Sequence, residues 1–185
     1  MIERGEHFRF ALKAPRRITH DNRLKNVGSL VSGFCQVAGT LGDKLGALLF
    51  QLPPNLKKDL AVFDAFLDEL PPKVRGAFEF RHASWLDEEI FARLASRNLA
   101  LCVADSEKLS APVRITADYA YFRLRDEGYT PDAIRRWADT IARETGADEF
   151  GDPLDAIRIY EIARALELEA INMVWGAAAC GTRAM

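Results

Sequence analysis

The sequence is poor in the features that would place it in a specialised class of protein. Its three cysteines, Cys35, Cys102 and Cys180, are widely spaced and form no paired-cysteine metal motif, so they are interpreted as free thiols in a reducing compartment. No apolar run approaches the roughly 20 residues of a membrane helix, and residues 1–6 lack the apolar core of a signal peptide. We therefore expect a cytoplasmic protein with no membrane segment.

The chain also lacks a charge excess and the common catalytic motifs. Lys and Arg number 25 against 27 Asp and Glu, which gives a formal net charge of -2. This balance removes a whole-surface argument for nucleic acid or acidic membranes, although it allows a local basic patch. There is no glycine-rich phosphate loop, nucleophile elbow or Ser-His-Asp order. The 185 residues, 49% of them apolar, suit one ordinary domain.

Short apolar runs alternate with segments of helical period along most of the chain. The runs predict strands at 8–12, 47–51, 77–80, 99–104 and 119–124. The intervening apolar stripes predict helices near 27–41, 60–70, 90–94 and 131–141. Five strand-then-helix units without hairpin signals favour parallel strands and an α/β architecture.

Polar residues recur at or just after the carboxyl ends of these strands. They are Lys13, Gln51, Glu79 with Arg81, Asp105, and Arg123. A (β/α)8 barrel builds its active site at these ends, whereas fewer strands contribute in an open sheet. The recurrence therefore favours a TIM-like barrel. Because a closed barrel needs about 200 residues or more, we expect an incomplete one.

The segment from Ala77 to Trp85 is the strongest candidate for a site. Glu79 and Arg81 share one face of the strand. Glu79 is a candidate general base or metal ligand, and alternatively the structural partner of Arg81. His82 is a candidate proton shuttle or ligand, or else a loop histidine bonded to backbone. Trp85 suits the wall of a site for a ring-shaped ligand, or else the seat of the following helix.

The cations indicate an anionic ligand. We expect the cations to converge on the mouth of the barrel: Lys13, Arg81, Arg123 and Arg125, with His20 and His82 nearby. Arginine's planar fork matches phosphate or carboxylate oxygens. Gln51 either presents an amide to the ligand or holds the turn that follows it. Asp105 is a candidate catalytic carboxylate, metal ligand or turn cap.

A divalent metal is compatible with this set but is not indicated by its spacing. The nitrogen and oxygen ligands on offer belong to His20, Glu79, His82 and Asp105. No spacing of the His-x-x-x-His or Glu-x-x-His type brings them together.

Two function classes follow. In the first, an enzyme acts on a phosphorylated or other anionic substrate, nucleic acid included, at the strand ends. Its catalytic residues are Glu79, His82 and Asp105, and its binding residues are Lys13, His20, Gln51, Arg81, Trp85 and Arg123. In the second, the same mouth is a non-catalytic anion- or partner-binding module, or an inactive fragment of a larger barrel.

Four motifs in order and at matching spacing resemble the YecE-like family, known as domain of unknown function 72. They are FRFALKAP with ITH at 8–20, LFQLPP at 49–54, FEFRH with SW at 78–85, and YFRL at 121–124. The resemblance covers about 7–142 and implies a TIM-like barrel. The family has no established activity, only a loose structural analogy to metal-dependent sugar isomerases and apurinic endonucleases.

The chain departs from that family at both ends. The usual glycine-rich first strand and the Glu-x-Asn-x-Thr-Phe-Tyr type strand are absent, as is the aromatic strand with paired asparagines after the Trp137 helix. We expect a partial barrel domain at 1–145 and a divergent tail at 146–185, with a helix that begins at Asp152. Self-association through unpaired strand edges is also expected.

Overall fold

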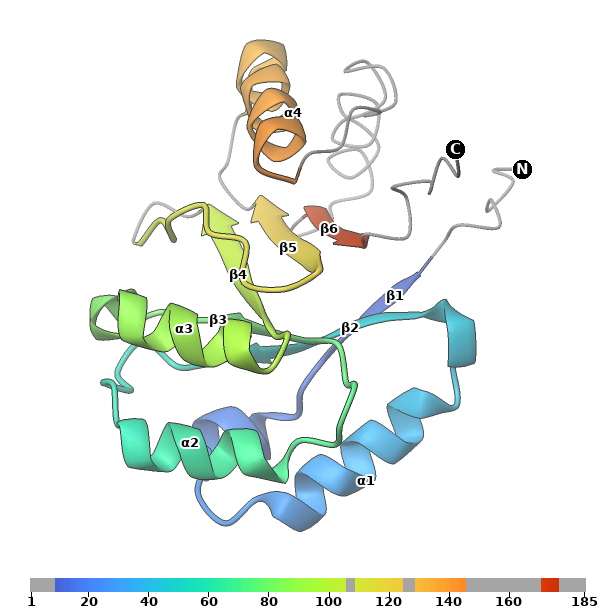
Figure 1. The fold of residues 1–185 in the computed structure, drawn as a ribbon, viewed down its shortest axis with the longest axis vertical. Coiled ribbons are helices and arrows are strands. Elements are labelled where there is room, and N and C mark those ends of the chain that lie inside the picture. The colour runs from blue at the N-terminus through green and yellow to red at the C-terminus, as the bar shows by residue number, and fades with distance from the viewer. Residues whose placement is uncertain (1–8, 106–108, 125–128, 146–170, 177–185) are drawn as a thin grey trace.

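The fold is built on one curled, six-stranded sheet. The computed structural model describes residues 9–105, 109–124, 129–145 and 171–176. The strands follow one another across the sheet in sequence order, the first five parallel and the last antiparallel to its neighbour (Figure 1). They are β1 (Phe10–Lys13), β2 (Leu45–Gln51), β3 (Gly76–Glu79), β4 (Ala100–Asp105), β5 (Tyr119–Leu124) and β6 (Ile171–Gly176). The five parallel strands form part of a TIM-like barrel, which confirms the predicted fold class.

Four α-helices lie outside the curve of the sheet. Helices α1 to α3 lie together below β1 to β3, and α4 lies beside the other end of the sheet (Figure 1). They are α1 (Gly28–Gly39), α2 (Leu60–Glu69), α3 (Glu88–Ser96) and α4 (Pro131–Thr145). Three short turns, η1 (Arg17–Asp21), η2 (Gly42–Lys44) and η3 (Ala83–Trp85), complete the order. The connection from β4 to β5 departs from the predicted strand-helix repeat, because residues 109–118 contain no helix.

Alternation along the strands separates a concave from a convex face. The convex face carries large aromatic side chains such as Phe50, Phe78 and Phe80, which pack against the helices. The concave face carries mostly small residues and two tyrosines: Ala47, Leu49, Ala77, Ala100, Cys102, Ala104, Tyr119 and Tyr121. Small side chains on the inside leave room for the sheet to curl, while large ones fill the gap between strands and helices.

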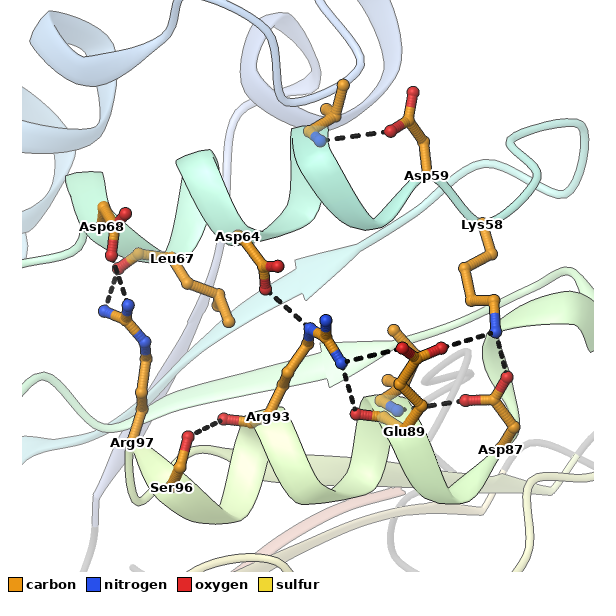
Figure 2. Close-up of polar contacts among 12 residues, drawn as sticks. Lys58, Asp59, Asp64, Leu67, Asp68, Asp87, Glu89, Arg93, Ser96 and Arg97 are labelled. Carbon is orange, nitrogen blue, oxygen red and sulfur yellow. Dashed lines mark hydrogen bonds and ion pairs between the residues drawn. The ribbon is translucent and has the colours of Figure 1, made fainter.

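Ion pairs connect the exposed sides of α2 and α3 (Figure 2). Arg93 Nε lies 2.7 Å from Asp64 Oδ1, and Arg97 pairs with Asp68 one turn further along both helices. At the start of α3, Asp87 accepts a hydrogen bond from Ile90 N at 3.0 Å and also pairs with Lys58. Surface pairs of this kind contribute little stability individually, so they mainly fix how the two helices sit against each other.

The region after α4 agrees only in part with the sequence prediction. The helix expected from Asp152 lies outside the described residues. Strand β6 was not predicted, although Ile171 to Trp175 is an apolar run rich in strand-forming residues. Its backbone pairs with β5 from Tyr119↔Gly176 to Leu124↔Ile171. No helix in the described part of the chain is long and apolar enough to span a membrane.

Candidate anion-binding site

The site lies where parallel strands end on the concave face. Gln51 and Glu79 are direct partners in the register of β2 and β3, and Arg123 is paired with Ala104 across β4 and β5. Each therefore takes the last inward position of its strand, because successive side chains alternate between faces. Lys13 ends β1, next to them. These four residues lie together at this edge of the sheet, while Arg125 lies outside the described residues.

One carboxylate lies at the centre of this group. Gln51 Nε2 donates to Glu79 Oε1 at 2.8 Å and to Oε2 at 2.9 Å. Arg81 Nε donates to Oε1 at 2.9 Å, and an Arg123 terminal nitrogen donates to Oε2 at 2.6 Å. Lys13 Nζ donates to Gln51 Oε1 at 2.8 Å, which fixes the orientation of the amide. We call Lys13, Gln51, Glu79, Arg81 and Arg123 the mouth cluster.

Glu79 is held in its ionised form. It is 2% exposed, and burial alone would raise its pKa. The charge of Arg123, the hydrogen bonds from Gln51 and Arg123, and the charge of Arg81 outweigh burial, so the pKa of Glu79 lies below its ordinary value. A carboxylate with a lowered pKa and four donated hydrogen bonds is a weak proton acceptor, but it is well suited to orienting the guanidinium groups around it.

The two arginines retain donors that Glu79 does not use. The Arg123 side chain is 12% exposed, and its buried Nε has no hydrogen-bond partner among the described residues. Arg81 is 34% exposed and donates to Glu79 through Nε, while its terminal nitrogens make no hydrogen bond to the described residues. An unpaired buried donor costs on the order of 1–3 kcal/mol. A ligand oxygen would relieve this cost.

His20 belongs to the surroundings of the mouth cluster. It lies in η1, where its Nδ1 is 2.8 Å from Thr19 Oγ1. Burial lowers the pKa of His20, and so do the charges of Arg16, Lys13 and Arg81. His20 therefore lies near Lys13 and Arg81 as a neutral imidazole. The buried Thr19 was missed in the sequence; a hydroxyl beside a candidate histidine was the available signal.

Cys102 was also missed as a neighbour of the site. It is fully buried on the concave face of β4, and burial raises the pKa of its thiol well above the ordinary value, as does the charge of Glu79. Alternation with Ala100 and Ala104 could have placed it there. The thiol is therefore uncharged and belongs to the apolar surface of the concave face near Glu79.

Trp85 is not a ligand wall. It is 1% exposed, stacks on Phe80 with ring centroids 5.1 Å apart, and meets Phe63 edge-on at 5.2 Å. Its Nε1 donates to Leu56 O at 2.7 Å. The indole is thus part of the core on the convex side of the sheet, beneath α2. This corresponds to the alternative interpretation, in which Trp85 supports the packing of the following helix.

His82 caps a turn. Its Nδ1 accepts a hydrogen bond from Ser84 N at 3.1 Å and lies 2.9 Å from Ser84 Oγ. Ser84 Oγ in turn accepts from Lys58 N at 2.8 Å. This is the backbone-bonded loop histidine of the alternative interpretation, and neither Ser84 nor Lys58 belongs to the mouth cluster.

Asp105 lies on the other face of the sheet. Alternation turns it away from Ala104 and towards α4, where Oδ2 accepts from Tyr129 Oη at 2.7 Å and from Trp137 Nε1 at 3.3 Å. A cavity of about 500 Å³ opens beside it, lined by Asp105, Tyr129, Thr130, Ala133, Arg136, Trp137 and Thr140. The expected grouping of Asp105 with Glu79 and His82 is therefore not formed.

No metal centre is apparent in the described part of the chain. Nowhere within it do three or more His, Cys, Asp or Glu side chains come together in a way that would hold an ion. The four ligands considered from sequence are instead divided among η1, the mouth cluster, the η3 turn and the convex face.

Comparison with known proteins identifies the family. The sequence model described as "Protein of unknown function DUF72" matches residues 3–153. The chain belongs to the DUF72 family. The resemblance to the YecE-like family is thereby confirmed, and residues 10–124, which carry the mouth cluster, fall inside the DUF72 match.

Relatives of this DUF72 chain support the same fold. It is 29% identical over 112 residues to the UPF0759 protein YecE of Escherichia coli strain K12, a match that covers 57% of this chain and 41% of YecE. A DUF72 family protein from Thermotoga maritima MSB8 superimposes with a TM-score of 0.62 at 21% identity, over 85% of this chain and 74% of the other. One from Enterococcus faecalis V583 gives 0.65 at 15% identity, over 89% and 76%.

Proposed function

We propose that the mouth cluster binds an anionic, phosphate-bearing ligand and that Glu79 orients its cations rather than transferring protons. The observation that carries this proposal is the arrangement of Lys13, Arg81 and Arg123 around one buried carboxylate. Two guanidinium groups, those of Arg81 and Arg123, pair with the single carboxylate of Glu79, so these three side chains together carry a positive charge. Fixed guanidinium groups in a partly desolvated mouth are suited to phosphate and carboxylate oxygens.

Binding is favoured over acid-base catalysis by the state of the candidate catalytic groups. The lowered pKa of Glu79 makes it a poor base at neutral pH. His82 is engaged with Ser84, and Asp105 is engaged with Tyr129 and Trp137 on the convex face. Among the described residues, the mouth has converging donors and no converging acid-base pair, which is the arrangement expected of a binding module.

The experiment titrates inorganic phosphate into the full chain at low ionic strength and measures the heat of binding by calorimetry. Arg81→Met should weaken binding about tenfold or more, because it removes a charge-assisted pair of donors. Arg93→Met is the matched control, since Arg93 is also an ion-paired arginine but lies on the outer helices. Undetectable binding by the unmodified chain, or equal losses in the two variants, would refute the proposed function.

A further inference from the structure

Tyr121 is a buried tyrosine whose hydroxyl forms no contact that stabilises the fold. It is 1% exposed on the concave face of β5, and its hydroxyl makes no hydrogen bond to the described residues. Tyr119, two residues earlier on the same face, is also buried, but its hydroxyl donates to Gly76 O at 2.8 Å. An unbonded buried hydroxyl destabilises a fold, so phenylalanine would suit the fold better at this position. The hydroxyl of Tyr121 therefore indicates a role other than folding.

The described neighbours of Tyr121 leave its hydroxyl without a good acceptor. Cys102 is its direct partner in the register of β4 and β5, and a thiol is only a weak acceptor. Glu79 is also near, but its carboxylate already accepts four hydrogen bonds from Gln51 and the two arginines of the mouth cluster. Burial raises the pKa of Tyr121, as do Cys102 and Glu79, while the charge of Arg123 lowers it. The hydroxyl thus stays protonated and is available as a donor.

A second buried donor lies on the same strand. Arg123 follows Tyr121 by two residues on the concave face, so the two positions are about 7 Å apart along β5. Arg123 Nε is buried and has no hydrogen-bond partner among the described residues. It is also closer to the strand than the terminal nitrogen that donates to Glu79. Two neighbouring inward positions of β5 therefore each hold a donor that lacks an acceptor in the described part of the chain.

We propose that Tyr121 is a further residue of the anion-binding site, and that its hydroxyl and Arg123 Nε bind one oxygen of the ligand on the inner side of the mouth cluster. This inference rests on the proposed function and extends the site inwards by one position of β5. Both groups donate, so the ligand atom that they bind is an unprotonated acceptor. Hydrogen bonds to such a charged oxygen are stronger than those between neutral groups. A terminal oxygen of a phosphate group meets this requirement.

The test compares Tyr121→Phe with Tyr119→Phe, which each remove one buried hydroxyl from the same face of β5. Inorganic phosphate is titrated into the full chain of each variant by calorimetry, and urea unfolding without phosphate measures stability. We expect Tyr121→Phe to weaken phosphate binding about fivefold or more and to leave the urea midpoint unchanged or raised. Tyr119→Phe should show the reverse, with a lower urea midpoint because Gly76 O loses its donor, and with an unchanged phosphate affinity.

The outcomes distinguish this inference from the function on which it rests. Phosphate binding that is equally tight in Tyr121→Phe and in the unmodified chain would overturn the role of Tyr121 and leave anion binding by the mouth cluster intact. Absence of phosphate binding by the unmodified chain would overturn both. A lower urea midpoint for Tyr121→Phe would also overturn the inference, because it would assign the hydroxyl to the fold.

Tyrosine absorption reports the contact itself. Phosphate should produce a tyrosine difference spectrum in the unmodified chain and in Tyr119→Phe, because the Tyr121 hydroxyl acquires a charged acceptor. The same spectrum should be absent from Tyr121→Phe at a phosphate concentration that saturates this variant. A tyrosine difference spectrum that persists in Tyr121→Phe would contradict a contact between its hydroxyl and the anion.

Discussion

Removing the charge of Glu79 should destabilise the protein because it leaves two guanidinium groups facing each other without a counter-charge. The side chain is 2% exposed, and Arg123 is 12% exposed. Loss of one partner of a buried ion pair costs about 3–5 kcal/mol, and because Glu79→Gln keeps one accepting oxygen, we place its cost near 3. For a chain of this size, that loss lowers the melting temperature by roughly 6–12 °C.

A double-mutant cycle separates the ion pair from other effects of substitution. The variants are Glu79→Gln, Arg123→Met and the two together, and the assay is urea unfolding followed by circular dichroism. The double variant should lose less than the sum of the singles, with a coupling of about 1–3 kcal/mol, because the first change has already broken the contact. Asp64→Asn with Arg93→Met forms the control cycle, where the pair is on the surface and the coupling should be much smaller.

Additive losses in the Glu79 and Arg123 cycle would refute this reasoning. They would mean that the 2.6 Å contact between Glu79 and Arg123 contributes no coupling free energy to the stability of the fold. A coupling equal to that of the control cycle would have the same meaning.

Two further predictions follow from the same contacts. The pKa of Glu79 in the folded protein lies below the value near 4.3 of an exposed glutamate, so its stabilising effect is present at neutral pH and is lost as the pH falls through the lowered pKa. The difference in unfolding free energy between the unmodified chain and Glu79→Gln should therefore shrink below about pH 4. A difference that grows below about pH 4 would contradict the lowered pKa. Trp85→Phe should cost about 1–3 kcal/mol in urea unfolding, because it leaves Leu56 O without its donor, yet phosphate affinity of the folded protein should not change; an affinity loss would return Trp85 to the ligand site.

Much of the fold could be predicted because the relevant signals are local. Alternation of apolar residues placed β1 to β5 within a few residues of their observed bounds, and the same alternation put Glu79 and Arg81 on one face. The carboxyl ends of parallel strands then brought Lys13, Gln51 and Arg123 to the same edge. These inferences depend only on the period of a strand and the direction of its neighbours.

The site predictions failed for residues whose position along the chain does not determine which face of the sheet they occupy. Asp105 is the last residue of its strand, as Glu79 is, but it is one residue out of phase with the concave face and turns to α4. Trp85 and His82 follow β3 on a turn, where strand alternation no longer applies. The pKa of Glu79 depends on Arg123 and Gln51, which are distant in sequence, as well as on the adjacent Arg81, so no local pattern could have set it.

The central claim is that the concave mouth, and not another surface, receives a phosphate-like anion. The most direct measurement is the crystal structure of the full chain grown with tungstate, a tetrahedral dianion whose anomalous scattering locates it without bias. The account predicts tungstate within hydrogen-bonding distance of Arg81 and Arg123, with Glu79 still bound to both. Tungstate bound only at other sites, with the mouth cluster unchanged and its arginines unoccupied, would contradict it.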